Sequence, residues 1–113
     1  VPTNDDISGV DVSITGGNAL SISATVAPGS TSGKTKVTTT NTKGQLYYNV
    51  VSASVTAPAF GSPISGVSGA TKYANGSDID ATVGKFVDLY EVDSEGNIVG
   101  FYETPALTAS DIK

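Results

Sequence analysis

Apolar and polar residues alternate along much of the chain. Residues Gly9–Thr15 alternate strictly, and the turn-forming sequence Gly16-Gly17-Asn18 follows them. In Leu20–Val26, apolar residues again occupy every second position. Because side chains of a strand point alternately to its two faces, both segments are predicted to be half-buried strands joined as a hairpin. The apolar residues that share one face of the first strand are Val10, Val12 and Ile14.

The next two strand-like segments differ in polarity. Lys34–Thr40 is almost entirely polar, with Val37 as its strongest apolar residue. Lysines on a strand oppose pairing with another chain, so this segment is predicted to be an edge strand. Gln45–Val55 is rich in residues that favour strands. Strand parity places Leu46, Tyr48 and Val50 on one face and Tyr47, Asn49 and Val51 on the other.

The second half of the chain contains one irregular region and one regular region. Ala57–Gly84 is interrupted by prolines and glycines, which predicts short strands or a packed loop and makes it our candidate for a functional loop. Lys85–Val92 and Asn97–Glu103 flank a turn sequence and predict a hairpin. Thr108–Lys113 is predicted to be a final short strand or a tail toward another module. We expect the irregular region to be held in place by Phe60, Ile64, Val67, Tyr73 and Ile79.

The pattern as a whole predicts an all-β fold. No segment shows the 3.6-residue apolar period of an amphipathic helix. About six to eight strands at regular spacing are typical of an immunoglobulin-like antiparallel β-sandwich. The length of 113 residues suits a single domain. We assign this domain to residues 9–113 and treat residues 1–8 as a polar lead-in.

The residue types that are missing restrict the chemistry. The sequence has no His, Cys, Met, Trp or Arg. Histidine is the usual acid–base group near neutral pH, so serine–histidine, cysteine–histidine and histidine–zinc chemistry is excluded. Without cysteine there are no disulfides and no thiolate metal sites. We therefore expect no enzymatic activity and no cofactor, with Ca²⁺ as the one candidate ion.

The charge balance restricts the partners. The net charge is −5, with six basic and eleven acidic residues. Such a surface repels nucleic acids, and no arginine is present to clamp a phosphate. No apolar stretch approaches the roughly 20 residues that span a membrane. The chain begins with Val1 rather than Met, so we expect a processed protein or a piece of a longer one.

The C-terminal part of the chain resembles a known class of modules. Residues 73–101 read YANGSDIDATVGKFVDLYEVDSEGNIVGF, with the upstream pieces KTKVTTT and LYYNV. This sequence resembles small Ser/Thr-rich immunoglobulin-like modules of secreted and cell-surface proteins of Gram-positive bacteria, and related phage structural proteins. The resemblance implies a structural or display role without enzymatic activity, and it assigns no functional residue.

Two groups of oxygen-bearing side chains are the candidate metal ligands. Asp78 and Asp80 lie two residues apart, and Asp93, Glu95 and Asn97 alternate at the tip of the predicted hairpin. Ca²⁺ takes about six to eight oxygen ligands, often from loops of this composition. The spacing does not match an EF-hand loop, so a solvated turn is the favoured interpretation and Ca²⁺ the alternative.

Other candidate sites receive plainer interpretations. Asp88 and Glu91 are paired carboxylates, but parity points them to opposite faces of a strand, against glycosidase chemistry. The sequence Asn75-Gly76-Ser77 matches a glycosylation sequon and is interpreted as a turn. A sugar-binding platform would need aromatic rings in a row. The rings suited to stacking on sugars are Tyr47, Tyr48, Tyr73, Tyr90 and Tyr102.

These observations favour a non-catalytic structural or interaction module of an extracellular surface assembly. It would be a repeat module, or a subunit of a layer or filament, and its partners would be itself or neighbouring modules. Val10, Val12 and Ile14 would then form a strand that completes a neighbour's sheet. One alternative is a phage decoration or tail-surface protein located in the virion. Another is a carbohydrate-binding module whose partner is a cell-wall or other glycan.

Overall fold

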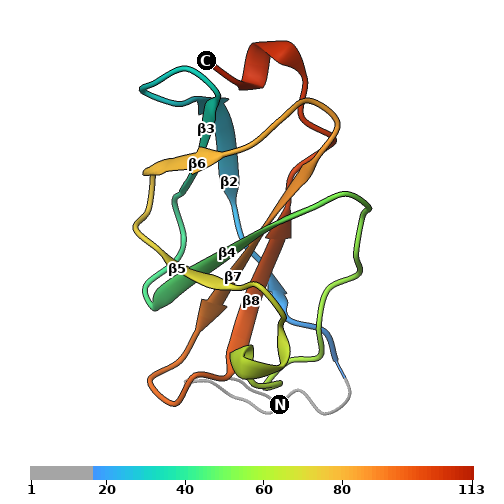
Figure 1. The fold of residues 1–113 in the computed structure, drawn as a ribbon. Helices are drawn as coiled ribbons and strands as arrows, with labels where there is room; N and C mark the ends of the chain where they lie inside the picture. Colours follow the sequence, from blue (N-terminus) through green and yellow to red (C-terminus); the bar gives the residue numbers. More distant parts are fainter. Residues whose placement is uncertain (1–16) are drawn as a thin grey trace.

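The computed structural model describes residues 17–113, which form two packed β-sheets (Figure 1). The predicted strand at Gly9–Thr15 and the boundary between residues 8 and 9 lie outside these residues. Within residues 17–113, no helix has the length and apolar character needed to cross a membrane. The elements are β1 (Leu20–Ser21), β2 (Ala24–Pro28), β3 (Lys34–Thr39), β4 (Gln45–Val51), the 3-10 helix η1 (Ile64–Gly66), β5 (Thr71–Tyr73), β6 (Asp78–Asp80), β7 (Phe86–Val92), β8 (Ile98–Glu103) and the 3-10 helix η2 (Ala109–Asp111).

The larger sheet has five strands in the order β1-β8-β7-β4-β5, and the smaller sheet has three in the order β2-β3-β6. The chain crosses from the smaller to the larger sheet between β3 and β4 and again between β6 and β7. The B–C and E–F connections of an immunoglobulin sandwich do the same. The predicted all-β sandwich is thus confirmed. One pair departs from the antiparallel rule, because β1 runs parallel to β8.

The core between the sheets is filled by side chains that alternate along their strands. Val37 and Ile79 enter it from the smaller sheet, and Val87 and Leu89 from the larger one, each almost fully buried. Tyr48 and Val50 pack against the same cluster as Leu46, as their shared parity predicts. The buried members are Val37, Leu46, Tyr73, Ile79, Ala81, Val87, Leu89 and Leu107.

A second apolar layer lies on the outer face of the larger sheet. Tyr90, Val92 and Ile98 are buried there, and Ile64 and Val67 pack onto them. Ile64 and Val67 belong to the cover loop (residues 52–70), which follows β4, runs down along the sheet and includes η1 (Figure 1). The region Ala57–Gly84 is therefore made of short strands and a packed loop, as predicted.

β3 is the central strand of the smaller sheet, so the predicted edge position of Lys34–Thr40 is wrong. Thr35 and Thr39 are buried on the same face as Val37. The Thr35 hydroxyl donates a hydrogen bond to the carbonyl oxygen of Ala27 at 3.1 Å. A threonine whose hydroxyl is satisfied in this way packs like a β-branched apolar residue. The polar composition thus concealed a buried face.

Side chains continue the hydrogen bonding of β3 beyond Lys36, where its pairing with β6 stops. The Tyr73 hydroxyl accepts the N–H of Val37 at 3.2 Å and donates to the Val37 carbonyl oxygen at 3.0 Å. The Asn75 amide accepts the N–H of Thr39 at 2.8 Å and donates to its carbonyl oxygen at 3.1 Å. Tyr73 ends β5 of the larger sheet, so these bonds tie the two sheets together.

The segment Leu20–Val26 was predicted as one strand, and the structure divides it between the sheets. The Ile22 N–H donates to the Phe101 carbonyl oxygen at 3.1 Å and so continues the β1–β8 pairing. From Ala24 onward the chain instead pairs with β3. The alternation of apolar residues continues unchanged where the chain passes from one sheet to the other. The sequence pattern therefore does not reveal this change of sheet.

The C-terminal segment Thr108–Lys113 contains η2 rather than the predicted strand or tail. The Asp111 carboxylate accepts the N–H of Thr108 at 2.9 Å, which closes the turn. Lys113 then lies against the β2–β3 turn, where its carbonyl oxygen accepts the Gly33 N–H at 2.8 Å. The chain end is therefore docked on the smaller sheet.

Candidate functional site

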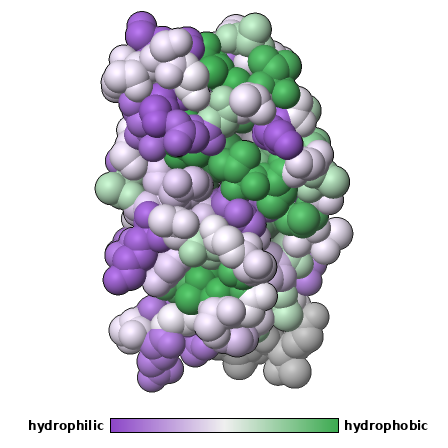
Figure 2. Space-filling model, viewed as in Figure 1, coloured by the Kyte–Doolittle hydropathy of each residue, from purple (hydrophilic) through white to green (hydrophobic). Residues whose placement is uncertain are grey.

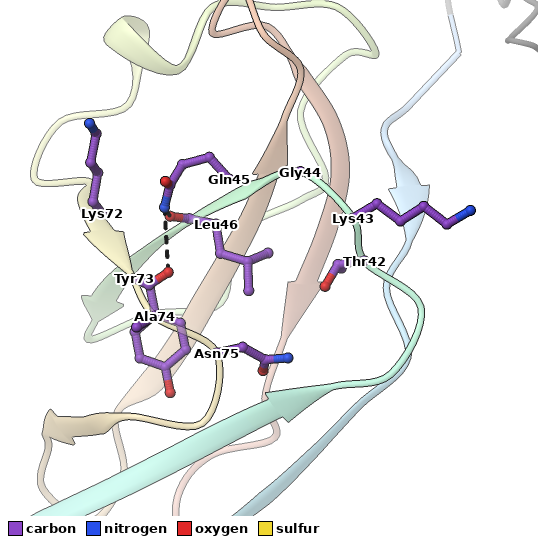
Figure 3. Close-up of a pocket in the computed structure, with 9 residues that line it drawn as sticks. All are labelled: Thr42, Lys43, Gly44, Gln45, Leu46, Lys72, Tyr73, Ala74 and Asn75. Carbon is purple, nitrogen blue, oxygen red and sulfur yellow. Dashed lines mark hydrogen bonds between the residues drawn. The ribbon is translucent and has the colours of Figure 1, made fainter.

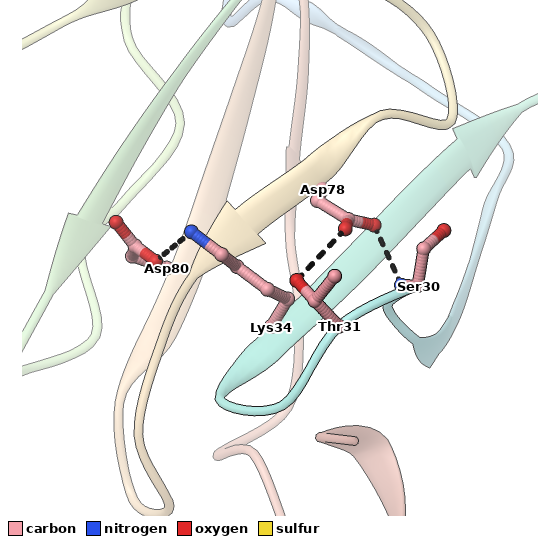
Figure 4. A network of polar contacts seen from close by, with 5 residues as sticks. All are labelled: Ser30, Thr31, Lys34, Asp78 and Asp80. Carbon is pink, nitrogen blue, oxygen red and sulfur yellow. Dashed lines mark hydrogen bonds and ion pairs between the residues drawn. The ribbon is translucent and has the colours of Figure 1, made fainter.

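The candidate ligands Asp78 and Asp80 both belong to β6, and both are engaged within the fold (Figure 4). Asp78 Oδ1 accepts the N–H of Ser30 at 2.8 Å, and its Oδ2 faces the Thr31 hydroxyl. Asp80 forms an ion pair with Lys34 across the β3–β6 pairing. These carboxylates close the β2–β3 turn and hold β6 against β3.

The other candidate ligands lie at the tip of the β7–β8 hairpin, which confirms the predicted turn. Asp93 Oδ1 accepts the N–H groups of Glu95 and Asn97, each at 2.9 Å. Gly96 has a φ of 81°, the left-handed conformation that such turns reserve for glycine. Residues 17–113 contain no group of three or more Asp or Glu side chains placed to hold a metal ion. The Ca²⁺ site stays a prediction, with its candidate ligands divided between strand β6 and the β7–β8 turn.

The five tyrosines are distributed over both faces of the larger sheet. Tyr48 and Tyr73 meet edge to face in the inter-sheet core, with ring centroids 5.4 Å apart, and Tyr102 packs against the same core. Tyr47 and Tyr90 lie under the cover loop. Because Tyr73 and Tyr90 are only 4% and 5% exposed, these rings form no sugar-binding row.

An open pocket of 580 Å³ lies between the turn before β4 and the segment after β5 (Figure 3). The Gln45 amide donates to the carbonyl oxygen of Leu46 at 2.7 Å, and the Asn75 amide is paired with β3. Lys43 and Lys72 extend away from the hollow into solvent (Figure 3). The polar side chains that line the pocket are thus used by the fold and are not aimed at a ligand.

The carboxylates of β7 have different partners, as their parity predicts. Glu91 accepts the N–H groups of Lys43 and Gly44 at 2.8 and 2.7 Å and closes the turn before β4. Asp88 faces the cover loop and has no exposed surface. The sequence did not indicate its neighbour, Glu103, which lies directly opposite on β8. Burial, followed by the hydrogen bond and charge of Glu103, raises the pKa of Asp88 to about 8.

On the face shown in Figure 2, green apolar residues gather in the middle and upper right, with hydrophilic residues around them. Leu20 and Val83 are exposed large apolar residues, 54% and 62% accessible. Scattered residues of this kind are normal on a soluble domain. The predicted interaction strand of Val10, Val12 and Ile14 lies outside the described residues.

Comparison with known proteins identifies the group to which this sandwich belongs. A family model described as the S-layer protein SbsC C-terminal domain matches residues 27–106, from within β2 to just beyond β8. The chain belongs to this family. A search of curated protein sequences finds no match.

Two solved structures resemble this SbsC-family domain. Domains 4–9 of surface layer protein SbsC share 28% identity with a TM-score of 0.68, covering 86% of this chain and 15% of that one. Domains 7, 8 and 9 of the S-layer protein SbsC share 26% identity with a TM-score of 0.65, covering 83% of this chain and 30% of that one. The chain thus spans less than a third of either structure.

Membership in the SbsC C-terminal domain family confirms the coarse form of the functional prediction, a structural module of a cell-surface protein. This family is a narrower group than the Gram-positive cell-surface modules that the sequence resembles. The virion alternative gains no support, because the matching family and both similar structures are surface-layer proteins.

Proposed function

We propose that the chain is one structural module of a surface layer, joined in series to similar β-domains and acting through contacts with neighbouring modules and copies. The family match across β3 to β8 carries this proposal. The coverage of the similar structures supports it. Shares of 15% of a six-domain structure and 30% of a three-domain structure are close to one domain each.

The shape of the domain supports a serial arrangement. Its principal extents are 46 × 23 × 21 Å. The first described residues lie at one end of the long direction, and the C-terminus lies at the other (Figure 1). Domains with their ends placed in this way can be joined end to end without a long linker.

The finer proposal is that Val10, Val12 and Ile14 form a strand that completes the sheet of a neighbouring copy. Their alternation suits insertion into a sandwich, because backbone pairing gives affinity and alternate side chains give specificity. The receiving position would be beside β2, which is one of the two outer strands of the smaller sheet among the described residues. An outer strand presents unpaired backbone groups to such a partner.

Two truncations test strand exchange. Removal of residues 1–8 should leave assembly intact, whereas removal of residues 1–15 should abolish it and leave a folded domain. Light scattering and electron microscopy measure assembly, and circular dichroism checks folding. Assembly by the shorter chain would contradict strand exchange. Absence of assembly by the full chain at millimolar concentration would contradict self-association of the module.

A substitution pair tests the same proposal without shortening the chain. Val12→Lys places a charge on the apolar face of the proposed strand, and Ser13→Lys places the same charge on the other face. We expect the first variant to lose assembly and the second to keep it. Equal assembly by the two variants would exclude a strand that inserts only one of its two faces into the partner.

A glycan-binding role has less support, because the tyrosines are divided between two faces and partly buried. Sedimentation of the protein with purified cell-wall material would decide the matter. Retention that competes with soluble wall fragments would favour the glycan-binding alternative.

A further inference from the structure

An acidic side chain lies buried beneath the cover loop. Asp88 is 0% exposed, and neither carboxylate oxygen has a hydrogen-bond donor among the described residues. In register, Asp88 lies between Asn49 of β4 and Glu103 of β8. A buried ionised carboxylate without donors or a cation is strongly disfavoured. The carboxyl group of Asp88 must therefore carry a proton, or have a hydrogen-bond donor or a cation as a partner.

Glu103 connects this buried group to the strap, the first part of the cover loop (residues 52–57). The carboxylate of Glu103 accepts the hydroxyl of Ser54 and, at 3.0 Å, the N–H of Val55. The strap has no strand or helix of its own. Among the described residues, the other side-chain hydrogen bond to the strap comes from the Lys85 ammonium, which donates to the Ser52 hydroxyl at 2.7 Å. Glu103 is thus both the main polar anchor of the strap and the neighbour of Asp88.

Within residues 17–113, no cation faces Asp88 from the elements around it. The cover loop contributes no ionisable residue anywhere in residues 52–70. β4 contributes Asn49 and Tyr47, and β8 contributes Glu103 and an apolar ring. On β7 the next residue on this face is Tyr90, whose pKa burial raises to about 12, so it stays neutral at moderately alkaline pH. Glu103 is the charged group that acts on Asp88.

Two ionised carboxylates only accept hydrogen bonds, so they cannot bond to each other. One shared proton changes this, because a protonated Asp88 donates to Glu103 and leaves Glu103 ionised to hold the strap. We propose that Asp88 and Glu103 form a proton-operated latch, closed while Asp88 carries its proton and opened when Asp88 loses it. Opening frees the strap and admits water to the face beneath it.

The acid strengths of the two groups agree with this division of roles. Burial, and then Glu103, raises the pKa of Asp88 to about 8. Desolvation opposes ionisation of Glu103, but hydrogen bonds from Asp88, Ser54 and Val55 hold its pKa below the ordinary value. At neutral pH the proton therefore resides on Asp88. Above about pH 8 both groups carry charge at directly opposed positions, and like charges there repel.

Hydrogen exchange of the strap amides, Val55 above all, tests the latch in the full chain. After correction for intrinsic exchange, protection should fall by up to about tenfold per pH unit between about pH 5 and 8, and level off above the Asp88 pKa of about 8. In Asp88→Asn the amide donates to Glu103 at every pH, so protection should not depend on pH. Glu91→Gln is the matched control, because Glu91 lies on the same strand and holds a different turn.

Three results would overturn the proposal. The first is strap protection in the unmodified chain that stays constant to about pH 9.5. The second is an Asp88→Asn variant with the same pH dependence as the unmodified chain. The third needs no variant: a ¹³C carboxyl signal of Asp88 that titrates near its ordinary pKa of about 4.

Discussion

Tyr73 shows how a single hydroxyl can join two layers of a sandwich. Its ring packs on Tyr48 in the core, and its oxygen both accepts and donates hydrogen bonds at Val37 of the opposite sheet. Without the hydroxyl, the buried Val37 N–H would lose its partner. An unsatisfied buried donor costs more than an average hydrogen bond contributes.

Tyr73→Phe should therefore lower the free energy of unfolding by about 1–3 kcal/mol. Urea denaturation followed by fluorescence measures this change. Tyr48→Phe is the matched control, since it keeps the partner ring of the same aromatic pair, and we expect it to cost less. A Tyr73→Phe variant as stable as the unmodified chain would show that water replaces the hydroxyl.

The buried carboxyl of Asp88 also predicts how stability depends on pH. Between about pH 4, where an unfolded carboxyl titrates, and about pH 8, the folded chain binds one proton more than the unfolded chain. The free energy of unfolding should therefore decrease as the pH rises through this window. Glu103 has a lowered pKa, and its opposite contribution is lost only at more acidic pH.

Denaturation at about pH 5, 7 and 9 measures this linkage. Asp88→Asn should remove most of the decrease, because the amide has no proton to lose in this range. If the unmodified chain becomes more stable from pH 5 to 7 by an amount that Asp88→Asn does not change, Asp88 is not protonated in the folded state.

For individual residues, the sequence could predict which face of a strand each side chain occupies. It correctly placed Tyr47 and Tyr48 on opposite faces and separated Asp88 from Glu91. It could not bring Asp88 to Glu103, because that neighbour depends on the register between two strands. Register is set by the β7–β8 turn and by the shift in pairing between Glu91 and Val92, not by either strand alone.

At the scale of elements, local patterns were sufficient where a strand pairs with its neighbour in sequence. The β7–β8 hairpin formed as predicted, with Gly96 in the left-handed turn position. The edge assignment of β3 failed because its second neighbour, β6, begins far along the chain at Asp78. The prediction of a single strand over Leu20–Val26 failed for a similar reason, since β1 pairs with β8, which lies near the other end of the chain.

Gly96 and Gly66 test the turn chemistry by the same substitution. Gly96→Ala should cost about 1–2 kcal/mol of stability, because an added Cβ disfavours the left-handed conformation. Gly66 has no positive φ, and a Cβ there would meet no atom within 4 Å. Gly66→Ala should therefore change stability little. Thermal denaturation of both variants measures the difference, and equal effects would contradict a conformational role for Gly96.

For the whole molecule, charge sets the conditions under which copies can meet. The net charge of −5 is carried by a short chain, so copies repel each other at low ionic strength. Added salt screens this repulsion over a distance of about 10 Å at 0.1 M. Assembly should consequently be faster and more extensive in about 0.5 M NaCl than in about 0.02 M.

Light scattering at the two salt concentrations measures this effect, and sucrose in place of salt controls for general crowding. Assembly that weakens with salt would indicate that complementary ion pairs between copies outweigh the net repulsion.

At the scale of the whole molecule, composition predicted a structural class of protein, because the missing residue types exclude several kinds of catalytic chemistry. The family, in contrast, required comparison with known proteins.

The parallel pairing of β1 with β8 has a mechanical consequence. The chain enters β1 at one end of the domain and leaves β8 toward the other (Figure 1). Tension between Gly17 and Lys113 would therefore pull these two strands past each other lengthwise. Their hydrogen bonds, including that from Ile22 to Phe101, would be strained together and not broken one by one. In the proposed end-to-end arrangement of modules, this pair of strands would therefore bear tension along the chain as shear.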